Sequence, residues 1–229
     1  MATPIRSTSL PDQLFDRLLS DIVEGRYAAG DRLPSQRTLA AEYGVNMASL
    51  RAAIDRLAQL RLVEVRQGEP MRVADWRTTG GLEVVAHAAM SEPTLIAAVF
   101  EARALLLREA ASLAAERADD ASRKEIMRLA EAFAASTAGQ ERQALDLAFM
   151  GAVIEAAGNL VFTLILNSMR AGYLARGGDF QAMVSADANL DAHYVKVARA
   201  IAAGKPAQAG RAMDSLTTAQ LTALIAGEG

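Results

Sequence analysis

The chain has 229 residues, of which 52% are apolar and only 5% aromatic, and its formal net charge is −3. This length and apolar content allow one large domain or two of ordinary size, each with its own core. There is no cysteine, which excludes disulfides and thiolate chemistry and fits a reducing cytoplasm. The opening residues lack the apolar stretch of a signal peptide, and no uncharged apolar run approaches the roughly 18 residues of a membrane span. We therefore expect a cytoplasmic protein with no membrane partner.

Local charge is more informative than the total. Residues 1–76 contain ten arginines and ten acidic residues, and the rest of the chain contains fourteen basic and seventeen acidic residues. A neutral N-terminal segment is compatible with DNA binding if its arginines gather on one face. Arginine suits contacts with phosphate and guanine, although a GC-rich genome would produce the same bias.

Three helices are predicted near the N-terminus. Residues 10–24 have apolar residues at the 3.6-residue spacing of an amphipathic helix. Ser35 is a suitable N-cap for a second helix at 36–43, and Asn46 for a third from Met47 to about Leu60. The glycine at 44 predicts a tight turn between them.

A hairpin is predicted after the third helix. Residues 62–66 partly alternate between apolar and charged side chains, Gln67 to Pro70 form a turn, and Met71 to Val73 resume extended structure. The order of helix, helix, turn, helix and hairpin is that of a winged helix-turn-helix, which places its third helix in the major groove of DNA. The alternative is a small three-helix domain whose hairpin has no role in DNA binding.

The segment EGRYAAGDRLPSQRTLAAEYGVNMASLRAAIDRLAQLRLVEVRQG resembles the DNA-binding domain of the GntR family. The most specific parts are G-D-R-L-P-S, the R-x-L-A before the glycine at 44, and L-R-x-A-I-x-x-L in the third helix. The resemblance implies that one group of residues contacts DNA: Arg37, Asn46, Met47, Ala48, Ser49, Arg51, Gln67 and Gly68.

Met47 departs from the pattern of many relatives, which have an arginine that contacts guanine at this position. A methionine can contact a thymine methyl group or pack against its own domain, so we expect a different operator. Gln67 and Glu69 also make the wing tip less basic than is usual, which predicts modest non-specific affinity.

The chain divides into a winged helix-turn-helix domain at 1–74, a linker at 75–81 and a helical domain at 82–229 that senses a ligand and dimerises. Trp76 is interpreted as an anchor that packs the linker against a domain. Helices are predicted from Pro93, from the Asp119–Asp120 pair to about Ala135, and over four later ranges. These are 139–157, 160–175, 187–203 and 206–226. The predicted fold is mainly α, with an antiparallel all-helical bundle of six or seven helices following the winged domain.

The bundle resembles the ligand-binding domain of the FadR subfamily of GntR regulators, through F-E-A-R at 100–103, L-D-x-x-F at 145–149, L-I-L-N-S-M at 164–169 and the A-I-x-x-G that ends at residue 204. Most members hold a metal with one aspartate and three histidines. Asp146 matches the aspartate, but Met150, Tyr194 and Leu216 stand where the histidines are expected. With only two histidines in the chain, we predict no metal and no cofactor. His87 and His193 are interpreted as ordinary surface or rim residues.

One branch of this subfamily lacks the same histidines and responds to long-chain acyl-coenzyme A. The R-x-G-x-P-x-x-V wing, W-x-T-x-G at 76–80 and G-N-x-x-x-x-L-I-L-N-x-M at 158–169 are similar to that branch. The three replacements would turn a polar cage into an apolar tunnel suited to an acyl chain. Asp146 would then need a partner, for which Arg103 and Tyr194 are candidates. The predicted ligand-binding residues are Arg103, Asp146, Met150, Tyr173, Tyr194 and Leu216.

Two alternatives remain for this pocket. Arg103 could hold a small organic acid without a metal, or the residues could fill a core around an unoccupied pocket. The final helix lacks the tyrosine and tryptophan expected of the acyl-CoA relative. The overall prediction is a homodimeric regulator that binds a double-stranded DNA operator and a small-molecule effector, either acyl-CoA or an organic acid. An enzyme is not expected, because the chain has no cysteine, no paired carboxylates at catalytic spacing and no Ser/His/Asp arrangement.

Overall fold

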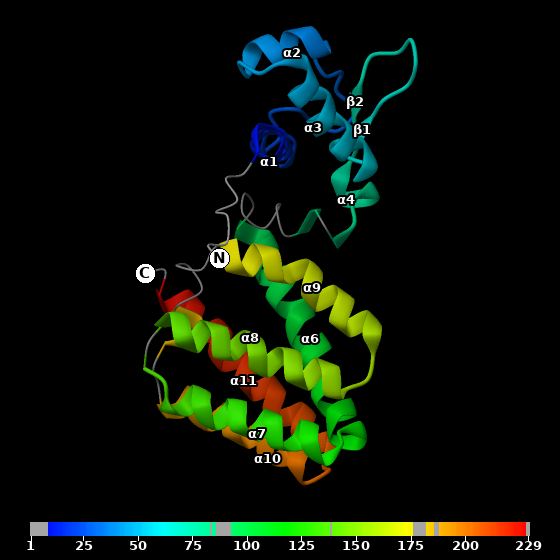
Figure 1. Ribbon diagram of the computed structural model, residues 1–229. Coiled ribbons are helices and arrows are strands. Elements are labelled where there is room, and N and C mark those ends of the chain that lie inside the picture. The colour runs from blue at the N-terminus through cyan, green and yellow to red at the C-terminus, as the bar shows by residue number, and fades with distance from the viewer. Residues whose placement is uncertain are drawn as a thin grey trace, which may run out of the picture. The chain divides into compact units, whose positions relative to one another are not determined.

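The computed structural model describes residues 9–82, 84–85, 93–137, 139–175, 182–185 and 188–227. They form two compact units, 1–96 and 97–229, each described separately below. The first contains short helices with a small β-hairpin and the second contains long helices (Figure 1). The predicted fold class, mainly helical with a winged helix-turn-helix before a helical bundle, is confirmed.

Three helices of the first unit begin where the sequence predicts. They are α1 Leu10–Val23, α2 Gln36–Glu42 and α3 Met47–Gln59. Each begins with a side chain that accepts a hydrogen bond from a backbone N–H of its first turn, and the three caps are Ser9, Ser35 and Asn46. Such caps satisfy N–H groups that have no partner within the helix.

The hairpin consists of β1 Val63–Glu64 and β2 Arg72–Val73, paired antiparallel with Val63 opposite Val73. A segment before α2 adds to its edge: the Gly30 N–H donates to the Val73 carbonyl at 2.8 Å, and the Leu33 N–H donates to the Met71 carbonyl at 2.9 Å. The sequence did not predict this edge pairing, because two-residue pairing leaves no alternation to detect.

The core of the first unit is formed by the apolar faces of α1 and α3 and by the inner side of the hairpin, with Phe15, Leu18, Leu50, Ile54 and Leu62 almost fully buried. The one-turn helix α4, Trp76–Thr79, follows the hairpin. Trp76 packs against this core, which agrees with its interpretation as an anchor. Burial of these side chains is the main stabilising contribution to a unit of this size.

A buried carboxylate fixes α1 against the end of α2. Asp21 is 2% exposed and accepts a hydrogen bond from the Tyr43 hydroxyl, which lies at the C-cap of α2. Arg26 Nη1 lies 3.2 Å from the same carboxylate, and Arg17 lies 3.5 Å from its other oxygen. Burial, and then the hydrogen bond to Asp21, raise the pKa of Tyr43 well above its usual range. The helix-turn-helix is therefore held by a charged and hydrogen-bonded cluster as well as by its core.

The second unit is built from α6 Pro93–Arg117, whose first four residues belong to the first unit, and from α7 Asp120–Ala135, α8 Gly139–Ala156, α9 Leu160–Ala175, α10 Ala188–Ala202 and α11 Pro206–Gly227. It also contains a short 3-10 helix, η1, at Ala182–Val184. Within this unit α10 packs against both α7 and α11, and α8 packs against α7 and α9 (Figure 1). The described part of this unit contains no strand. Across both units, none of the helices that are described is long and apolar enough to cross a membrane.

Candidate functional site

The N-terminal end of α3 presents most of the predicted DNA-contacting residues to solvent. Asn46, Ala48 and Arg51 are exposed, and Met47 is exposed to 36%. Ser49 differs because it is only 8% exposed, and its backbone N–H donates to the Asn46 side chain at 2.8 Å. The exposed face of this helical turn therefore carries four different groups. They are the capping amide of Asn46, the thioether of Met47, the methyl group of Ala48 and the guanidinium of Arg51.

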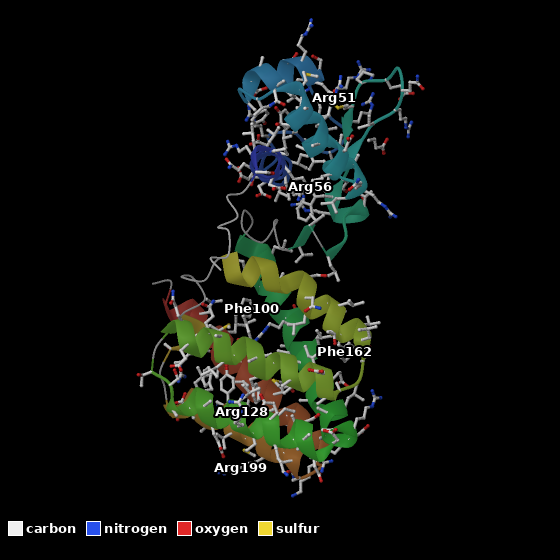
Figure 2. All side chains as sticks on the ribbon, viewed as in Figure 1. Arg51, Arg56, Phe100, Arg128, Phe162 and Arg199 are labelled. Atoms are coloured by element: carbon white, nitrogen blue, oxygen red, sulfur yellow. The ribbon has the colours of Figure 1, made fainter. Side chains whose placement is uncertain are left out.

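Two arginines of α3 have opposite surroundings (Figure 2). Arg56 is directed toward α1, where its Nη1 lies 2.6 Å from Asp12 Oδ1 and its guanidinium lies 3.9 Å from the centre of the Phe15 ring. Arg51 is exposed and has no acidic partner among the residues that are described. The same holds for Arg37 on α2. Arg51 and Arg37 are thus available to phosphates, whereas Arg56 joins two helices.

The tip of the wing carries Gln67 and Gly68, both exposed. Gly68 has a φ of +78°, a conformation that glycine adopts readily, and a Cβ built there would meet nothing within 4 Å. Arg66 lies 3.2 Å from Glu64 and 4.0 Å from Glu69. These two exposed carboxylates partly offset the charge of Arg66, which weakens its attraction for phosphate.

A polar cluster lies inside the helical unit and joins four helices: α6, α8, α10 and α11. The Tyr194 hydroxyl donates to Asp146 Oδ1 at 2.6 Å, and Gln220 Nε2 donates to the same oxygen at 2.9 Å. Gln220 Nε2 also lies 2.7 Å from the Tyr194 hydroxyl, and Arg103 Nη1 donates to Gln220 Oε1 at 2.9 Å. Arg103 Nη2 is 3.8 Å from Asp146 Oδ2. These four residues are called the Asp146 cluster below.

Because the Asp146 cluster is buried, the contacts that Asp146 makes matter for the stability of the helical unit. Asp146 is 1% exposed, Tyr194 and Gln220 are fully buried, and the Arg103 side chain is 13% exposed. A carboxylate removed from water is costly unless it is paired and hydrogen-bonded. Arg103 provides the opposite charge, while Tyr194 and Gln220 provide hydrogen-bond donors. The expectation that Asp146 has Arg103 and Tyr194 as partners agrees with these contacts.

Aromatic packing extends from the cluster to a second buried cation. The Phe133 ring stacks on Tyr194 with centroids 3.7 Å apart, and the Phe149 ring meets Tyr194 edge-on at 5.1 Å. The guanidinium of Arg142 lies 4.0 Å from the centre of Phe133. Contacts of this kind favour one orientation of each ring. The Tyr194 hydroxyl is thereby held toward Asp146.

Arg142 is fully buried and links α8 to α7, η1 and α10 through hydrogen bonds and an ion pair. Its guanidinium donates to the carbonyls of Phe133 and Ser136 at the end of α7, at 2.9 and 2.8 Å, and to the Val184 carbonyl of η1 at 2.5 Å. It also pairs with Asp191 at 2.6 Å. Arg142 thus satisfies carbonyl groups that the end of a helix leaves without partners.

The residues present do not fit a metal ion. Met150 and Leu216 are buried at the positions where the resemblance expected histidines, and neither supplies a suitable nitrogen or oxygen. Among the described residues, no group of three His, Cys, Asp or Glu side chains is placed to hold a metal. Asp146 is instead engaged by neutral donors and Arg103. His193 is partly buried, and His87 lies outside the described residues.

The structure places the predicted ligand residues in two ways. Arg103, Asp146 and Tyr194 come together in the Asp146 cluster. Met150 lies one helical turn after Asp146 on α8, and Leu216 lies one turn before Gln220 on α11, both in the core. Tyr173 belongs to α9, but its side chain lies outside the described part.

Sequence reasoning missed Gln220 and Arg142. Gln220 follows Leu216 by one helical turn, so helical spacing alone could have placed it on the same face. Arg142 gave no such signal, because an arginine at the start of a helix is usually exposed. Its burial depends on carbonyl groups that only the folded chain brings together.

Two protein families match this chain. The model of bacterial regulatory proteins of the gntR family matches residues 10–73, and the model of the FCD domain matches residues 98–219. The first covers the winged helix-turn-helix, and the second covers Arg103, Asp146 and Tyr194 of the Asp146 cluster and ends one residue before Gln220.

Individual relatives agree with these matches. The chain is 31% identical to the HTH-type transcriptional regulator Mce2R of Mycobacterium tuberculosis, over 97% of this chain and 95% of that protein. It is 29% identical to the fatty acid metabolism regulator protein of Cronobacter sakazakii, over 70% of this chain and 67% of that protein. A solved structure of Lar, which controls the agr system of Listeria monocytogenes, superposes with a TM-score of 0.60 at 16% identity, covering 97% of this chain and 99% of that one. The likeness to Lar concerns the fold alone.

Proposed function

Because this chain belongs to the gntR family of bacterial regulatory proteins and carries an FCD domain, we propose that it is a homodimeric transcriptional regulator whose affinity for a DNA operator is set by an effector in the helical unit. The relatives described above are transcriptional regulators and not enzymes. The observation that carries the DNA-binding part is the exposed N-terminal end of α3, where Arg51 has no acidic partner within the described part of the chain.

The DNA contacts divide into two classes. Arg37 and Arg51 contact phosphates, or base edges where the geometry permits. Asn46 and Ala48 approach the backbone at the start of α3, and Met47 contacts the methyl group of a thymine in the major groove. Ser49 contributes through the helix N-terminus, because its side chain is nearly buried. Gln67 and Gly68 approach the neighbouring minor groove through the wing.

The operator contacts imply two copies of the chain. One winged domain contacts too few base pairs to select a site within a genome, whereas a two-fold dimer doubles the contacts and binds a pseudo-palindrome. Half-sites are then spaced by about one helical turn of DNA, or a multiple of it. Native mass spectrometry at micromolar concentration tests this assembly, and a monomer alone would contradict the proposed geometry.

We propose a long-chain fatty acyl-CoA as the effector, bound among Met150, Leu216 and the Asp146 cluster. Charge supports this class: Arg103 and Asp146 already cancel one another, so an added carboxylate would leave a net negative charge in a buried site. A thioester carbonyl is uncharged and accepts hydrogen bonds. The relative from Cronobacter sakazakii is named as a regulator of fatty acid metabolism, which adds support at the level of resemblance.

Arg103 is the residue best suited to receive the effector. Its guanidinium donates one hydrogen bond to Gln220, and its nearest nitrogen to Asp146 is 3.8 Å away, beyond hydrogen-bonding distance. A guanidinium has five N–H donors, so Arg103 can turn to an acceptor on the ligand while Tyr194 and Gln220 keep Asp146 satisfied. Such a change shifts α6 relative to α11 and thereby alters the population of DNA-binding states.

A small organic acid is the second candidate, favoured by the same guanidinium. In that case the acid's carboxylate pairs with Arg103 without a metal, and Asp146 keeps its hydrogen bonds from Tyr194 and Gln220. Thermal-shift measurements on the full chain separate the two classes. Stabilisation by palmitoyl-coenzyme A, and not by coenzyme A or short carboxylic acids, supports the acyl class, and the reverse result supports the organic acid.

The experiment that tests the function as a whole combines both units. Operator affinity is measured by fluorescence anisotropy with and without the stabilising compound, for the natural chain and for Arg103→Ala. The expected result is an effector-dependent change in affinity that Arg103→Ala abolishes while affinity without effector is retained. An identical effector response in both proteins would exclude the Asp146 cluster as the sensing site.

A further inference from the structure

A groove of about 1050 Å³ runs between α10 and α11 in the helical unit. Its lining includes five alanines, namely Ala134, Ala192, Ala200, Ala203 and Ala212, together with Val195. Because these side chains are short, the two helices leave a shallow depression between them. None of the Asp146 cluster residues lines this groove, so it is a separate feature of the bundle.

Four cations line the groove: Lys196, Arg199, Lys205 and Arg211. All four are exposed, and none has an acidic partner or a side-chain hydrogen bond in the described part of the chain. Arg199 can be followed on α10 in Figure 2. The four cations share the lining of one groove, and neighbouring like charges repel unless an anion binds between them.

Among the described residues, one carboxylate lines the groove, that of Asp191. It does not neutralise the four cations, because its Oδ1 lies 2.6 Å from Nη2 of the buried Arg142. The Asp191 charge is therefore already compensated from within the bundle. Asp191 therefore leaves the charge of the four cations largely uncompensated within the described lining.

The placement of lysine supports a specific role. The chain uses arginine for almost all its basic residues and contains only three lysines, at 124, 196 and 205. Two of the three line this groove. Lysine offers a compact charge and arginine a planar fork, and both bind phosphate oxygens. Lys205 also precedes Pro206, the first residue of the 22-residue α11, so the positive end of that helix dipole adds to the same potential.

We infer that this groove binds a nucleotide carrying a pyrophosphate group, with the phosphates between the four cations and the nucleoside on the alanine floor. The size supports an organic ligand, since about 1050 Å³ is at the upper end of pockets for small molecules and larger than a pyrophosphate ion alone would need. Gln208 also lines the groove and can exchange hydrogen bonds with the base or the ribose. This second site does not depend on the proposed effector or on DNA binding.

Isothermal titration of the full chain with ADP and with inorganic pyrophosphate tests this inference. The groove variant is Lys196→Gln with Arg199→Gln, and the matched control is Lys124→Gln with Arg128→Gln on α7. Both change the net charge equally at exposed residues, and the control residues lie outside the groove. Circular dichroism verifies that both variants fold.

The expected result is saturable binding of one ADP per chain, weakened at least tenfold in the groove variant and less than twofold in the control. ADP should bind more tightly than pyrophosphate, because only ADP contacts the alanine floor. Equal loss in both variants would reduce the effect to general charge and overturn the site. If pyrophosphate binds with the same affinity as ADP, the assignment of the groove to a nucleotide is overturned. If the groove variant loses affinity for the operator but keeps its affinity for ADP, the nucleotide assignment is also contradicted. The cations of the groove would then be assigned to DNA binding.

Discussion

The hydroxyl of Tyr194 donates a 2.6 Å hydrogen bond to Oδ1 of Asp146, and both residues are almost completely buried. This contact occupies a carboxylate that the resemblance to metal-binding regulators would assign to a metal. Gln220 donates to the same oxygen. A set of neutral donors and one arginine therefore replaces the imidazoles as the stabilising environment of Asp146.

Tyr194→Phe tests this relationship. The variant keeps the ring stacked on Phe133 but removes one donor from a buried carboxylate, so we expect the free energy of unfolding to fall by about 1–3 kcal/mol. Urea denaturation followed by circular dichroism measures the change. In a double-mutant cycle with Asp146→Asn, the two losses should be clearly non-additive. Additive losses would show that the hydroxyl and the carboxylate contribute independently.

Arg51→Ala and Arg56→Ala form a matched pair on the same helix. Arg51 is exposed and pairs with no acidic residue that the structure describes, so its loss should weaken operator binding and reduce the slope of log affinity against log salt by about one. Arg56 instead pairs with Asp12 and covers Phe15, so its loss should lower the stability of the N-terminal unit and leave the salt slope unchanged. Anisotropy titrations at several salt concentrations, together with thermal melts, distinguish the two. Equal salt slopes for both variants would mean that α3 does not face DNA with its N-terminal end.

Substitutions in the wing should strengthen DNA binding instead of weakening it. Glu64→Gln with Glu69→Gln removes the two carboxylates that neutralise Arg66. The released arginine can bind a phosphate, so affinity for any duplex should rise several-fold and the salt slope should steepen by about one. Glu131→Gln with Glu155→Gln, on exposed positions of α7 and α8, changes the net charge equally and should have little effect. A similar rise in both variants would indicate a general charge effect and not a wing contact.

The start of α7 predicts part of the acid sensitivity of the helical unit. A hydrogen bond from the Ser122 backbone N–H lowers the pKa of Asp119 below its usual value of 3.8. A folded pKa below the unfolded one means that this stabilisation is present at neutral pH and is lost as pH falls through the folded pKa. Asp119→Asn keeps an acceptor for the cap but should show a smaller fall in melting temperature in acid. Asp120→Asn removes the same charge one residue later. Its melting temperature should fall in acid by as much as that of the natural chain.

The sequence was most informative where local signals agree. Ser35, Asn46 and Asp119 marked helix starts correctly, because a side chain that can accept from its own first turn has an effect independent of the remaining fold. The absence of histidines at Met150, Tyr194 and Leu216 was also evident, once the resemblance to the FadR subfamily indicated where that subfamily carries them. These features rest on contacts within a few residues or on residue identity.

Other features depend on segments far apart in the chain. The pairing of residues 30–33 with the hairpin, the burial of Arg142 against η1 and the role of Gln220 each need partners brought together by the fold. Periodicity reports which face of a helix is apolar, but it does not identify which polar residue on that face finds a partner. The cationic groove was missed for the same reason, since its four cations come from α10, α11 and the loop between them.

Selection of binding sites from a pool of random duplexes, at physiological salt, tests the central claim most directly. We predict a pseudo-palindromic sequence that one dimer binds at least about a thousandfold more tightly than random duplex, with Arg51→Ala losing most of that affinity. Recovery of no preferred sequence, or an unchanged preference in Arg51→Ala, would contradict the claim that the exposed end of α3 selects the operator.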